Sequence, residues 1–306
     1  MAQAGAAPPP GATLFVDCDD CLCVHRALWR GERGRGRERA AARSFDGGLV
    51  LERLRAPDLA HAPADARTHR YTNGWKTAKL LTARIEHFCT ERLSLPEGKA
   101  RLSERCAPEN SLGTPSDAAS CPVQAYQLYK THGTALRGLI NEGLMEESDT
   151  EMFLQYCHDV SLADIEEDGD LRAVLDKVHP SVDVYVFTAS IREHAQRCLE
   201  RLGLSSYRFK DIIDCRTTNL ATKHSEEAYV LAQKAAGVED ASLCYFVDDS
   251  TSNMRAAKAV GWNTCLVGRI HRDTGEPLTS QHADKQVGTL HELIDATGWP
   301  LFSSTQ

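Results

Sequence analysis

Two pairs of acidic residues follow apolar runs in this chain, at positions where carboxylates can carry out chemistry. Asp17 and Asp19 follow the run TLFV, and Asp248 and Asp249 follow LCYFV. In an extended chain, residues two apart point the same way, so we expect the carboxylates of Asp17 and Asp19 to reach one crevice. One carboxylate can attack a phosphorus atom, and a second can protonate the leaving oxygen and then activate water. The alternative interpretation is an acidic turn at the end of a strand, where Asp is common.

Asp248 and Asp249 are candidates for holding a metal ion together with Asp17. Adjacent acids repel each other unless a cation or hydrogen-bond donors offset their charge. Mg²⁺ prefers oxygen ligands and takes one or two carboxylates plus phosphate and water. Asp17 and Asp248, at the ends of neighbouring strands, would supply such a site. The alternative is that the two acids only cap the helix that follows them, near its positive end.

A hydroxyl and a lysine complete the candidate site. Thr188 and Ala189 follow the run VYVF, where a hydroxyl and backbone N–H groups at the start of a helix can hold a phosphate. Lys223 could neutralise the charge that builds up on Asp17 and a phosphoryl group. Taken alone, Thr188 is an ordinary helix cap and Lys223 an ordinary surface residue, so both gain meaning only from the acidic pairs.

Strands and helices alternate in the regions that carry these residues. Short apolar, β-rich runs predict buried strands, and an apolar stripe that ends near a glycine predicts each helix. This alternation predicts right-handed βαβ units and a doubly wound, Rossmann-like parallel sheet, which is an α/β fold. The strands are expected at 13–16, 184–187 and 243–247, with weaker candidates at 211–214 and 264–267, and the helices at 191–202, 225–236 and 250–260.

The chain between the first two strong strands has a different, all-helical pattern. We therefore expect an α/β core formed by residues 13–22 and 180–300, a helical cap over 23–179, and a disordered leader over 1–12. Apolar spacing predicts helices in the cap at 75–93, with Asn73 able to cap it, and at 126–144, 152–156 and 171–178.

Two stretches of the cap lack sustained periodicity. Residues 24–70 are rich in Arg, Gly and Ala, and residues 101–124 are rich in Ser, Pro, Ala and Asn. Both compositions are typical of disorder. The arginine-rich run is more typical of a solvated loop than of a nucleic-acid site.

The composition excludes several classes of protein. A net charge of −8 argues against a surface that coats nucleic acid. No apolar run approaches the roughly 18 residues that cross a bilayer, and the first residues lack the pattern of a signal peptide. The 11 scattered cysteines are then expected to be reduced thiols in an intracellular protein, either cytoplasmic or nuclear. A metal–thiolate site formed by Cys18, Cys21 and Cys23 lacks the second pair of ligands that zinc sites usually have.

Four segments, in this order, resemble the motifs of the haloacid-dehalogenase-like (HAD) superfamily. They are DCDDCL (17–22), FTAS (187–190), TKHSEEAY (222–229) and FVDDSTSN (246–253). Two further segments, YKTHGTALRGLI (129–140) and HAQRCLERLGL (194–204), resemble the pyrimidine 5′-nucleotidase group of that superfamily.

The resemblance assigns a role to each candidate residue. It implies Asp17 as the nucleophile and Asp19 as the acid and base. Thr188 would bind phosphate, with the neighbouring Ala189 backbone, and Lys223 would stabilise the developing charge. Asp248 and Asp249 would hold Mg²⁺, which Asp17 and the backbone carbonyl of Asp19 would also contact.

The chain departs from the family pattern at a few places. Cys21 stands where the first motif usually has Thr, and His224 follows Lys223 where Pro is commoner. Neither change removes a charge that the chemistry needs. Joining Leu22 or Cys23 to Tyr71, and Ala100 to Tyr126, would restore a compact family-like cap. The two poorly patterned stretches are therefore interpreted as lineage-specific loops or as mis-spliced gene sequence.

The sequence thus predicts a Mg²⁺-dependent phosphomonoester hydrolase that forms an aspartyl-phosphate. The resemblance favours a pyrimidine nucleoside 5′-monophosphate as substrate, with no membrane and no nucleic-acid partner. Pyridoxal phosphate, flavin mononucleotide or a sugar phosphate would need the same core, and so would a phosphomutase. A dehalogenase would not need Asp19. An idle regulatory module on the same fold is a further alternative, against which the intact Asp17, Asp19, Lys223 and Asp248 count. The sequence does not indicate an oligomeric state.

Overall fold

The six strands found in the described residues form one parallel sheet. The computed structural model describes residues 7–23, 76–93, 125–271, 275–294 and 298–303. Within them the strands lie in the order β3-β2-β1-β4-β5-β6, and every neighbouring pair is parallel. The predicted doubly wound α/β fold is therefore confirmed. The strands are β1 (Thr13–Val16), β2 (Asp183–Phe187), β3 (Ile212–Ile213), β4 (Cys244–Asp248), β5 (Asn263–Val267) and β6 (Lys285–Val287).

The strand order places the acidic residues at one edge of the sheet. The chain leaves β1 towards β2 and β3 and later returns to β4 on the other side of β1, so the order reverses beside β1. Val16 lies opposite Val186 in β2 and opposite Val247 in β4. The three strands consequently end at the same level. Ligands of open α/β sheets bind at such a switch point, beyond the carboxyl ends of the strands.

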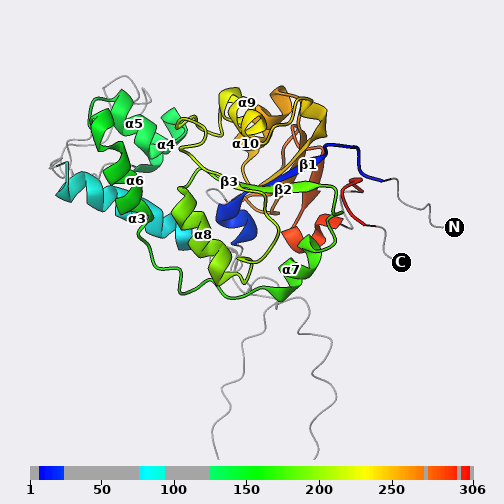
Figure 1. Ribbon diagram of the computed structural model, residues 1–306. Helices are drawn as coiled ribbons and strands as arrows, with labels where there is room; N and C mark the ends of the chain where they lie inside the picture. Colours follow the sequence, from blue (N-terminus) through cyan, green and yellow to red (C-terminus); the bar gives the residue numbers. More distant parts are fainter. Residues whose placement is uncertain (1–6, 24–75, 94–124, 272–274, 295–297, 304–306) are drawn as a thin grey trace, which may run out of the picture.

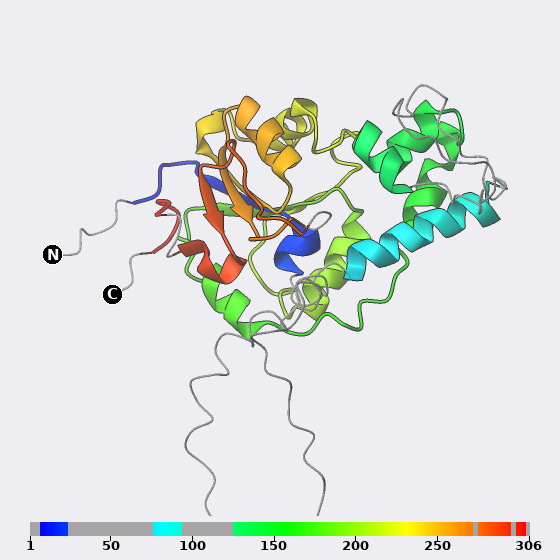
Figure 2. The same cartoon turned by 180° about the vertical axis from the view of Figure 1, so that it is seen from behind.

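Helices cover both faces of the sheet (Figures 1 and 2). Side chains of one strand point alternately to the two faces, and β1 shows this directly. Leu14 and Val16 pack in the cluster that includes α7 and α8 residues, whereas Phe15 packs in the cluster that includes α9 and α10 residues. Phe15 stacks on Trp262, with ring centroids 4.5 Å apart. The helices are α7 (Gly169–Leu175), α8 (Arg192–Arg201), α9 (Glu226–Ala235) and α10 (Thr251–Ala259).

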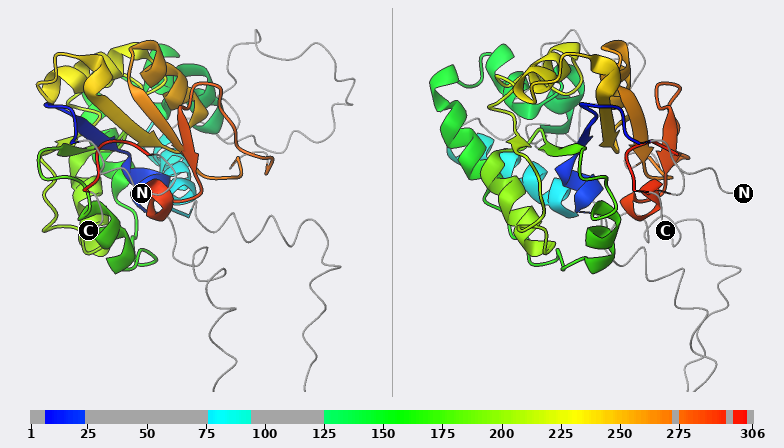
Figure 3. Two further views of the ribbon diagram at one scale, coloured as in Figure 1. Left: turned by 90° about the vertical axis from the view of Figure 1, so that its right-hand side faces the viewer. Right: turned by 45° about the vertical axis from the view of Figure 1, so that its right-hand side comes forward.

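A second group of helices lies beside the sheet rather than on its faces (Figures 1 and 3). It has its own apolar cluster, in which Phe88, Leu139 and Phe153 are buried. Ile191 and Cys215 of the α/β part also belong to this cluster, so the two parts are packed together. The helices are α3 (Lys76–Glu91), α4 (Ala125–His132), α5 (Ala135–Asn141) and α6 (Thr150–His158).

One predicted helix of this group is wrong. The single helix expected over 126–144 is two helices, α4 and α5. Gly133 separates them with a φ of +82°, a backbone conformation that glycine adopts without strain. Thr134 then caps α5, because its hydroxyl accepts a hydrogen bond from the Arg137 N–H at 3.1 Å. The apolar periodicity continues across this break and therefore hid it.

The other predicted elements agree with the structure to within a few residues, with two exceptions. Strand β6 was not predicted, because only Val287 of its residues is buried. Helix α7, which falls in the range expected for the cap, contributes Leu171 and Leu175 to the core under the sheet. The suggested cap Asn73 and the two poorly patterned stretches lie outside the described residues.

Short single-turn elements connect the main ones. They are η1 (Cys18–Leu22), η5 (Glu147–Asp149), η6 (Ala241–Leu243) and η7 (Leu290–Glu292). In the part of the chain that the structure describes, no helix combines the length and the apolar character needed to cross a membrane.

Candidate active site

The chain turns sharply directly after β1. The Asp17 N–H donates to the Val247 carbonyl at 3.0 Å and so continues the pairing of β1 with β4. A π-helical turn, η1, follows, in which the Cys23 N–H donates to the Cys18 carbonyl at 3.1 Å. The expectation of an extended chain through Asp19 is therefore wrong. Asp17, just before the turn, and Asp19, within it, consequently have different surroundings and different hydrogen-bond partners.

The Asp17 carboxylate is paired with a buried lysine. The Lys223 ammonium donates to Asp17 Oδ1 at 2.6 Å and to Asp248 Oδ2 at 2.8 Å. The Asn253 amide donates to both oxygens of Asp248, at 2.9 and 3.0 Å, and the Ser250 N–H donates to Asp248 Oδ1 at 2.8 Å. Asp17, Lys223 and Asp248 are 6%, 4% and 0% exposed. Lys223 is thus a buried cation that joins the ends of β1 and β4.

Charges around Asp17 are unbalanced in favour of acids. Burial raises the pKa of Asp17 well above its ordinary value, and the neighbouring carboxylates of Asp248, Asp249 and Asp19 raise it further. The Lys223 ammonium acts in the opposite direction. For Lys223, burial works to lower the pKa, but the charges of Asp17 and Asp248 outweigh burial and raise it. The lysine is therefore protonated, and the site still favours an additional positive charge.

Asp19 has a separate set of donors. The Ser190 hydroxyl donates to Asp19 Oδ2 at 2.6 Å, and His194 Nε2 lies 3.0 Å from Asp19 Oδ1. The Thr188 hydroxyl lies 3.5 Å from Asp19 Oδ2. Ser190 and His194 are 5% and 0% exposed. This second cluster connects η1 to β2 and α8.

Asp19 and His194 form an ion pair in which the histidine is fully buried and the Asp19 side chain is 24% exposed. Burial works to raise the pKa of Asp19, but the charge and hydrogen bond of His194, with the Ser190 hydroxyl, hold it well below its ordinary value. Burial likewise works to lower the pKa of His194, and Asp19 raises it to about 10. Within the described residues, His194 Nδ1 is buried without a hydrogen-bond partner. This unpartnered atom offsets part of the stabilisation from the ion pair.

Thr188 lies at the end of β2, as expected for a phosphate-binding hydroxyl. Its own N–H donates to the Ile213 carbonyl at 3.0 Å, and its hydroxyl oxygen accepts from the Ser190 N–H at 3.0 Å. Thr188 is buried, whereas Ala189 is exposed at the mouth of the turn. The structure thus brings Thr188 beside Asp19 and leaves the backbone of Ala189 accessible.

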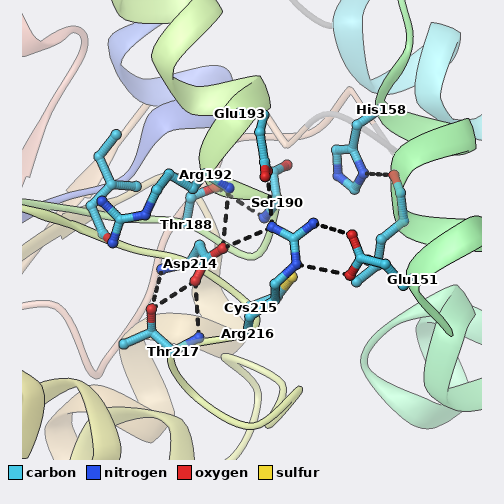
Figure 4. Close-up of polar contacts among 12 residues, drawn as sticks. Glu151, His158, Thr188, Ser190, Arg192, Glu193, Asp214, Cys215, Arg216 and Thr217 are labelled. Carbon is cyan, nitrogen blue, oxygen red and sulfur yellow. Dashed lines mark hydrogen bonds and ion pairs between the residues drawn. The ribbon is translucent and has the colours of Figure 1, made fainter.

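An arginine joins the helical group to the α/β part beside this site (Figure 4). Arg216, in the loop after β3, donates to Glu151 at the start of α6 at 3.0 and 2.7 Å. It also donates to Glu193 of α8 at 2.8 Å and to Asp214 at 3.4 Å. The pKa of Arg216 is raised, first by its hydrogen bonds to Glu151. Arg216 therefore fixes α6 relative to α8, the helix that carries His194.

A second contact between the two parts lies next to Lys223. The Tyr129 hydroxyl of α4 lies 3.3 Å from His224 Nε2, and the two rings meet edge to face. Gly133 approaches Thr222 so closely that a Cβ built on it would lie 2.3 Å from the Thr222 hydroxyl oxygen. The helical group consequently rests on the residues that flank the catalytic candidate Lys223.

Comparisons with known proteins agree with this arrangement. A family model described as haloacid dehalogenase-like hydrolase matches residues 12–261. The chain belongs to this family. All the candidate residues, from Asp17 to Asp249, fall within the matched range.

Among individual proteins, this hydrolase is similar to Phosphate metabolism protein 8 of Saccharomyces cerevisiae. The two are 25% identical over 189 residues, which cover 57% of each chain. The hydrolase thus spans little more than half the length of this curated relative.

Solved structures of dehalogenases and of a yeast protein are also similar to this hydrolase. An L-2-haloacid dehalogenase from Xanthobacter autotrophicus shares 13% identity with a TM-score of 0.39, covering 92% of this chain and 96% of its own. The UTR4 protein of Saccharomyces cerevisiae shares 12% identity with a TM-score of 0.38, covering 92% of this chain and 98% of its own. A dehalogenase in an intermediate complex shares 15% identity with a TM-score of 0.44, covering 98% of this chain and 100% of its own.

Members of this family typically use a divalent metal, and the hydrolase has donors for one. Carboxylate oxygens of Asp17 and Asp249 and the Cys21 thiol lie within 4.8 Å of one another. Mg²⁺ usually takes one or two carboxylates from a protein. The raised pKa of Asp17 reflects its burial first and the neighbouring acids after it. Asp248, also predicted among the ligands, accepts hydrogen bonds from Lys223 and Asn253. The Asp19 carboxylate faces Ser190 and His194, and the predicted contact of its backbone carbonyl with the metal stays a prediction.

Sequence reasoning missed several polar residues of this hydrolase site. Ser190 and Asn253 stood inside recognised motifs but had no assigned role, and His194 lay in a segment noted only for its resemblance. Arg216 was not noticed at all. Ser190, His194 and Arg216 act through partners far away in the sequence, which apolar spacing does not reveal, whereas Asn253 acts through Asp248, five residues before it. The signal that would have found His194 is its place on the apolar stripe of α8, where a histidine needs a buried partner.

Proposed function

We propose that this hydrolase removes phosphate from phosphomonoesters, with Mg²⁺ bound by Asp17 and Asp249 and with a phosphoryl group carried transiently on Asp17. The observation that supports this proposal best is the separate surroundings of the two carboxylates. Lys223 holds Asp17 at 2.6 Å, and Ser190 and His194 hold Asp19. Two carboxylates with separate partners can take the separate roles of nucleophile and acid–base group.

The residues of the chain would divide the reaction between them. Asp17 Oδ attacks the phosphorus atom, while the Lys223 ammonium and the Thr188 hydroxyl bind the developing negative charge. Asp19 passes a proton from the neighbouring His194 imidazolium to the leaving oxygen, and it then returns to His194 a proton taken from the water that attacks the aspartyl-phosphate. His194 keeps Asp19 in position through both steps. A bound Mg²⁺ would supply positive charge to the phosphoryl oxygens.

Asp19 also separates this proposal from dehalogenation. Displacement of a halide leaves an anion that needs no proton, so the acid role of Asp19 would not be needed in that step. The name of the yeast relative, Phosphate metabolism protein 8, favours phosphate chemistry as well. A phosphomutase would use the same charged groups and would transfer phosphate rather than release it.

We further propose that α3, α4, α5 and α6 form a cap that selects the leaving group. The α/β residues described above would contact only the phosphate and the metal. The cap meets the α/β part beside Lys223, through Tyr129 and Gly133. Closure of a cap excludes water during phosphoryl transfer, and its opening releases the product. Resemblance of residues 129–140 to pyrimidine 5′-nucleotidases favours UMP and CMP as substrates.

Phosphate release from a panel of phosphomonoesters tests the proposal. The panel contains UMP, CMP, purine nucleotides, pyridoxal phosphate, flavin mononucleotide and sugar phosphates, each with and without Mg²⁺, and Asp17→Asn is the blank. We expect Mg²⁺-dependent release that is highest for UMP or CMP and absent in the blank. Highest release from another compound would contradict the nucleotide part only. A folded protein that releases no phosphate, or a blank as active as the wild type, would overturn the proposal.

A further inference from the structure

Three cysteines meet in the core next to η1. The Sγ atoms of Cys18, Cys23 and Cys198 lie within 4.8 Å of one another. Cys18 and Cys198 are 0% exposed and Cys23 is 7% exposed. The active-site chemistry proposed above uses none of the three thiols. The cluster therefore needs an explanation of its own.

The local backbone explains why these thiols converge. Cys18 and Cys23 are joined by the hydrogen bond that closes the π-helical turn, at 3.1 Å, so they lie one turn apart on the same side of η1. Helix α8 packs against η1 and carries both Cys198 and His194. The two residues are four apart on α8 and therefore share one face of it.

A histidine nitrogen lies next to one thiol of the cluster. His194 Nε2 lies 3.5 Å from Cys198 Sγ, and the His194 side chain is 0% exposed. Three thiols and one imidazole are a donor set of structural zinc sites, which are tetrahedral with Zn–S distances of about 2.3 Å. Neighbouring donors in such a tetrahedron are about 3.5–3.8 Å apart. The three Sγ atoms and the Cys198–His194 contact lie near these separations, and binding of an ion would draw His194 Nε2 towards Cys18 and Cys23.

We infer that Cys18, Cys23, Cys198 and His194 form a binding site for a thiophilic divalent cation such as Zn²⁺. This site is distinct from the oxygen-rich site of Asp17 and Asp249. Cys21, the remaining cysteine of η1, lies with those two aspartates and not with the thiol cluster. The fold supplies, from α8, the ligands that the spacing of the cysteines in η1 lacks.

The inferred site shares a side chain with the proposed active site. His194 Nε2 lies 3.0 Å from Asp19 Oδ1, and the same nitrogen would bind the cation. A bound ion would take this nitrogen from Asp19 and would tie η1 to α8. One equivalent of Zn²⁺ is therefore expected to lower turnover in excess Mg²⁺.

Cobalt spectroscopy tests the site directly and does not depend on activity. Co²⁺ is added, up to one equivalent, to the reduced full-length protein in excess Mg²⁺, and the thiolate-to-cobalt charge-transfer band is recorded. We expect one such band in the wild type and its loss in Cys198→Ala. Cys21→Ala controls for the oxygen-rich site and Cys244→Ala controls for removal of a buried thiol elsewhere; both should retain the band. If Cys198→Ala does not fold, Cys23→Ala replaces it.

Several results would overturn the inference. The first is a wild type without the band. The second is a band that survives in both Cys198→Ala and Cys23→Ala, or one that disappears only in Cys21→Ala. The third is mass-spectrometric evidence that the metal-free cluster rests as a disulfide under the same reducing conditions. Equal inhibition of the wild type and Cys198→Ala by one equivalent of Zn²⁺ would likewise place the ion at the oxygen-rich site.

Discussion

His194 shows how one buried residue sets the charge of a neighbour. Its Nε2 atom lies 3.0 Å from Asp19, and the side chain is fully buried. The pKa of His194 is raised to about 10, from an ordinary value of about 6.5. Folding therefore favours the imidazolium, and Asp19 stays ionised beside it.

This ion pair predicts a specific dependence of stability on pH. The contribution of a raised histidine pKa is fully present below pH 6.5 and is lost as pH rises towards 10. The unpartnered Nδ1 offsets part of this contribution. We therefore expect the free energy of unfolding to fall by about 2 kcal/mol across this pH range. Urea unfolding of wild type and His194→Gln at several pH values measures the difference, with His179→Gln as a control outside the cluster. A difference that stays constant from pH 6.5 to 10 would contradict the assignment.

At the scale of residues, the sequence predicted which polar side chains lie at the ends of strands. Asp17, Thr188 and Asp248 lie at strand ends, and the structure places them together because the strands are parallel and end at one level. The partners of those residues were not predictable in this way. Ser190 and His194 are defined by the contacts they make, and these depend on the turn η1 and on the packing of α8.

At the scale of elements, Arg216 joins α6 to α8. Its side chain is 30% exposed and its partners Glu151 and Glu193 are 54% and 62% exposed, so each pair contributes modestly to stability. Asp214 is only 4% exposed and has further donors from Thr217 and the Arg192 N–H. The main consequence of the network is therefore orientation of α6 rather than stability.

Arg216→Gln should accordingly raise KM more than it changes kcat. Loss of the ion pairs should cost about 1 kcal/mol. If this free energy is lost from closure of the cap on the substrate, substrate binding becomes about fivefold weaker. Arg269→Gln is the matched control, since Arg269 pairs with Glu292 on the surface at 3.1 Å and away from α6. Steady-state kinetics on the best substrate of the panel provide the measurement. An equal change of KM in both variants would argue against the orienting role.

The elements themselves were largely predictable because their apolar spacing is regular. The strand TLFV is fully buried on both faces, as its uninterrupted apolar run indicates. Where the local pattern conflicts with backbone geometry, prediction failed. Gly133 breaks a continuous apolar stripe through its positive φ, and β6 is held by pairing with β5 rather than by its own apolar residues.

At the scale of the whole molecule, the contact of Gly133 with Thr222 places the helical group on the α/β part. A side chain at position 133 would meet the Thr222 hydroxyl oxygen at 2.3 Å and its Cβ at 2.9 Å. Thr222 directly precedes Lys223. The proposed cap and the proposed charge stabiliser are therefore mechanically linked.

Gly133→Ala should reduce kcat/KM by about tenfold or more, because it displaces the cap from Lys223. Gly143→Ala is a close control: Gly143 also has a positive φ, of +66°, but an added Cβ would meet nothing within 4 Å. Backbone strain should cost each variant about 1 kcal/mol of stability, and the contact with Thr222 should add to this loss in Gly133→Ala alone. Steady-state kinetics and urea unfolding of the two variants distinguish the effect of backbone strain from the effect of displacing the cap. Equal losses of kcat/KM in the two variants would contradict the link.

The most direct test of the central claim is to trap the phosphoryl group on the protein. Asp19→Asn is mixed with p-nitrophenyl phosphate and Mg²⁺, then quenched with acid and digested. The leaving group of this substrate needs little protonation, whereas breakdown of the intermediate needs the base that Asn cannot supply. We predict that mass spectrometry finds a phosphoryl group on Asp17 and finds none in the Asp17→Asn/Asp19→Asn double variant. The mechanism would be contradicted if the wild type releases phosphate but Asp19→Asn carries no phosphoryl group on Asp17, or carries it on another residue.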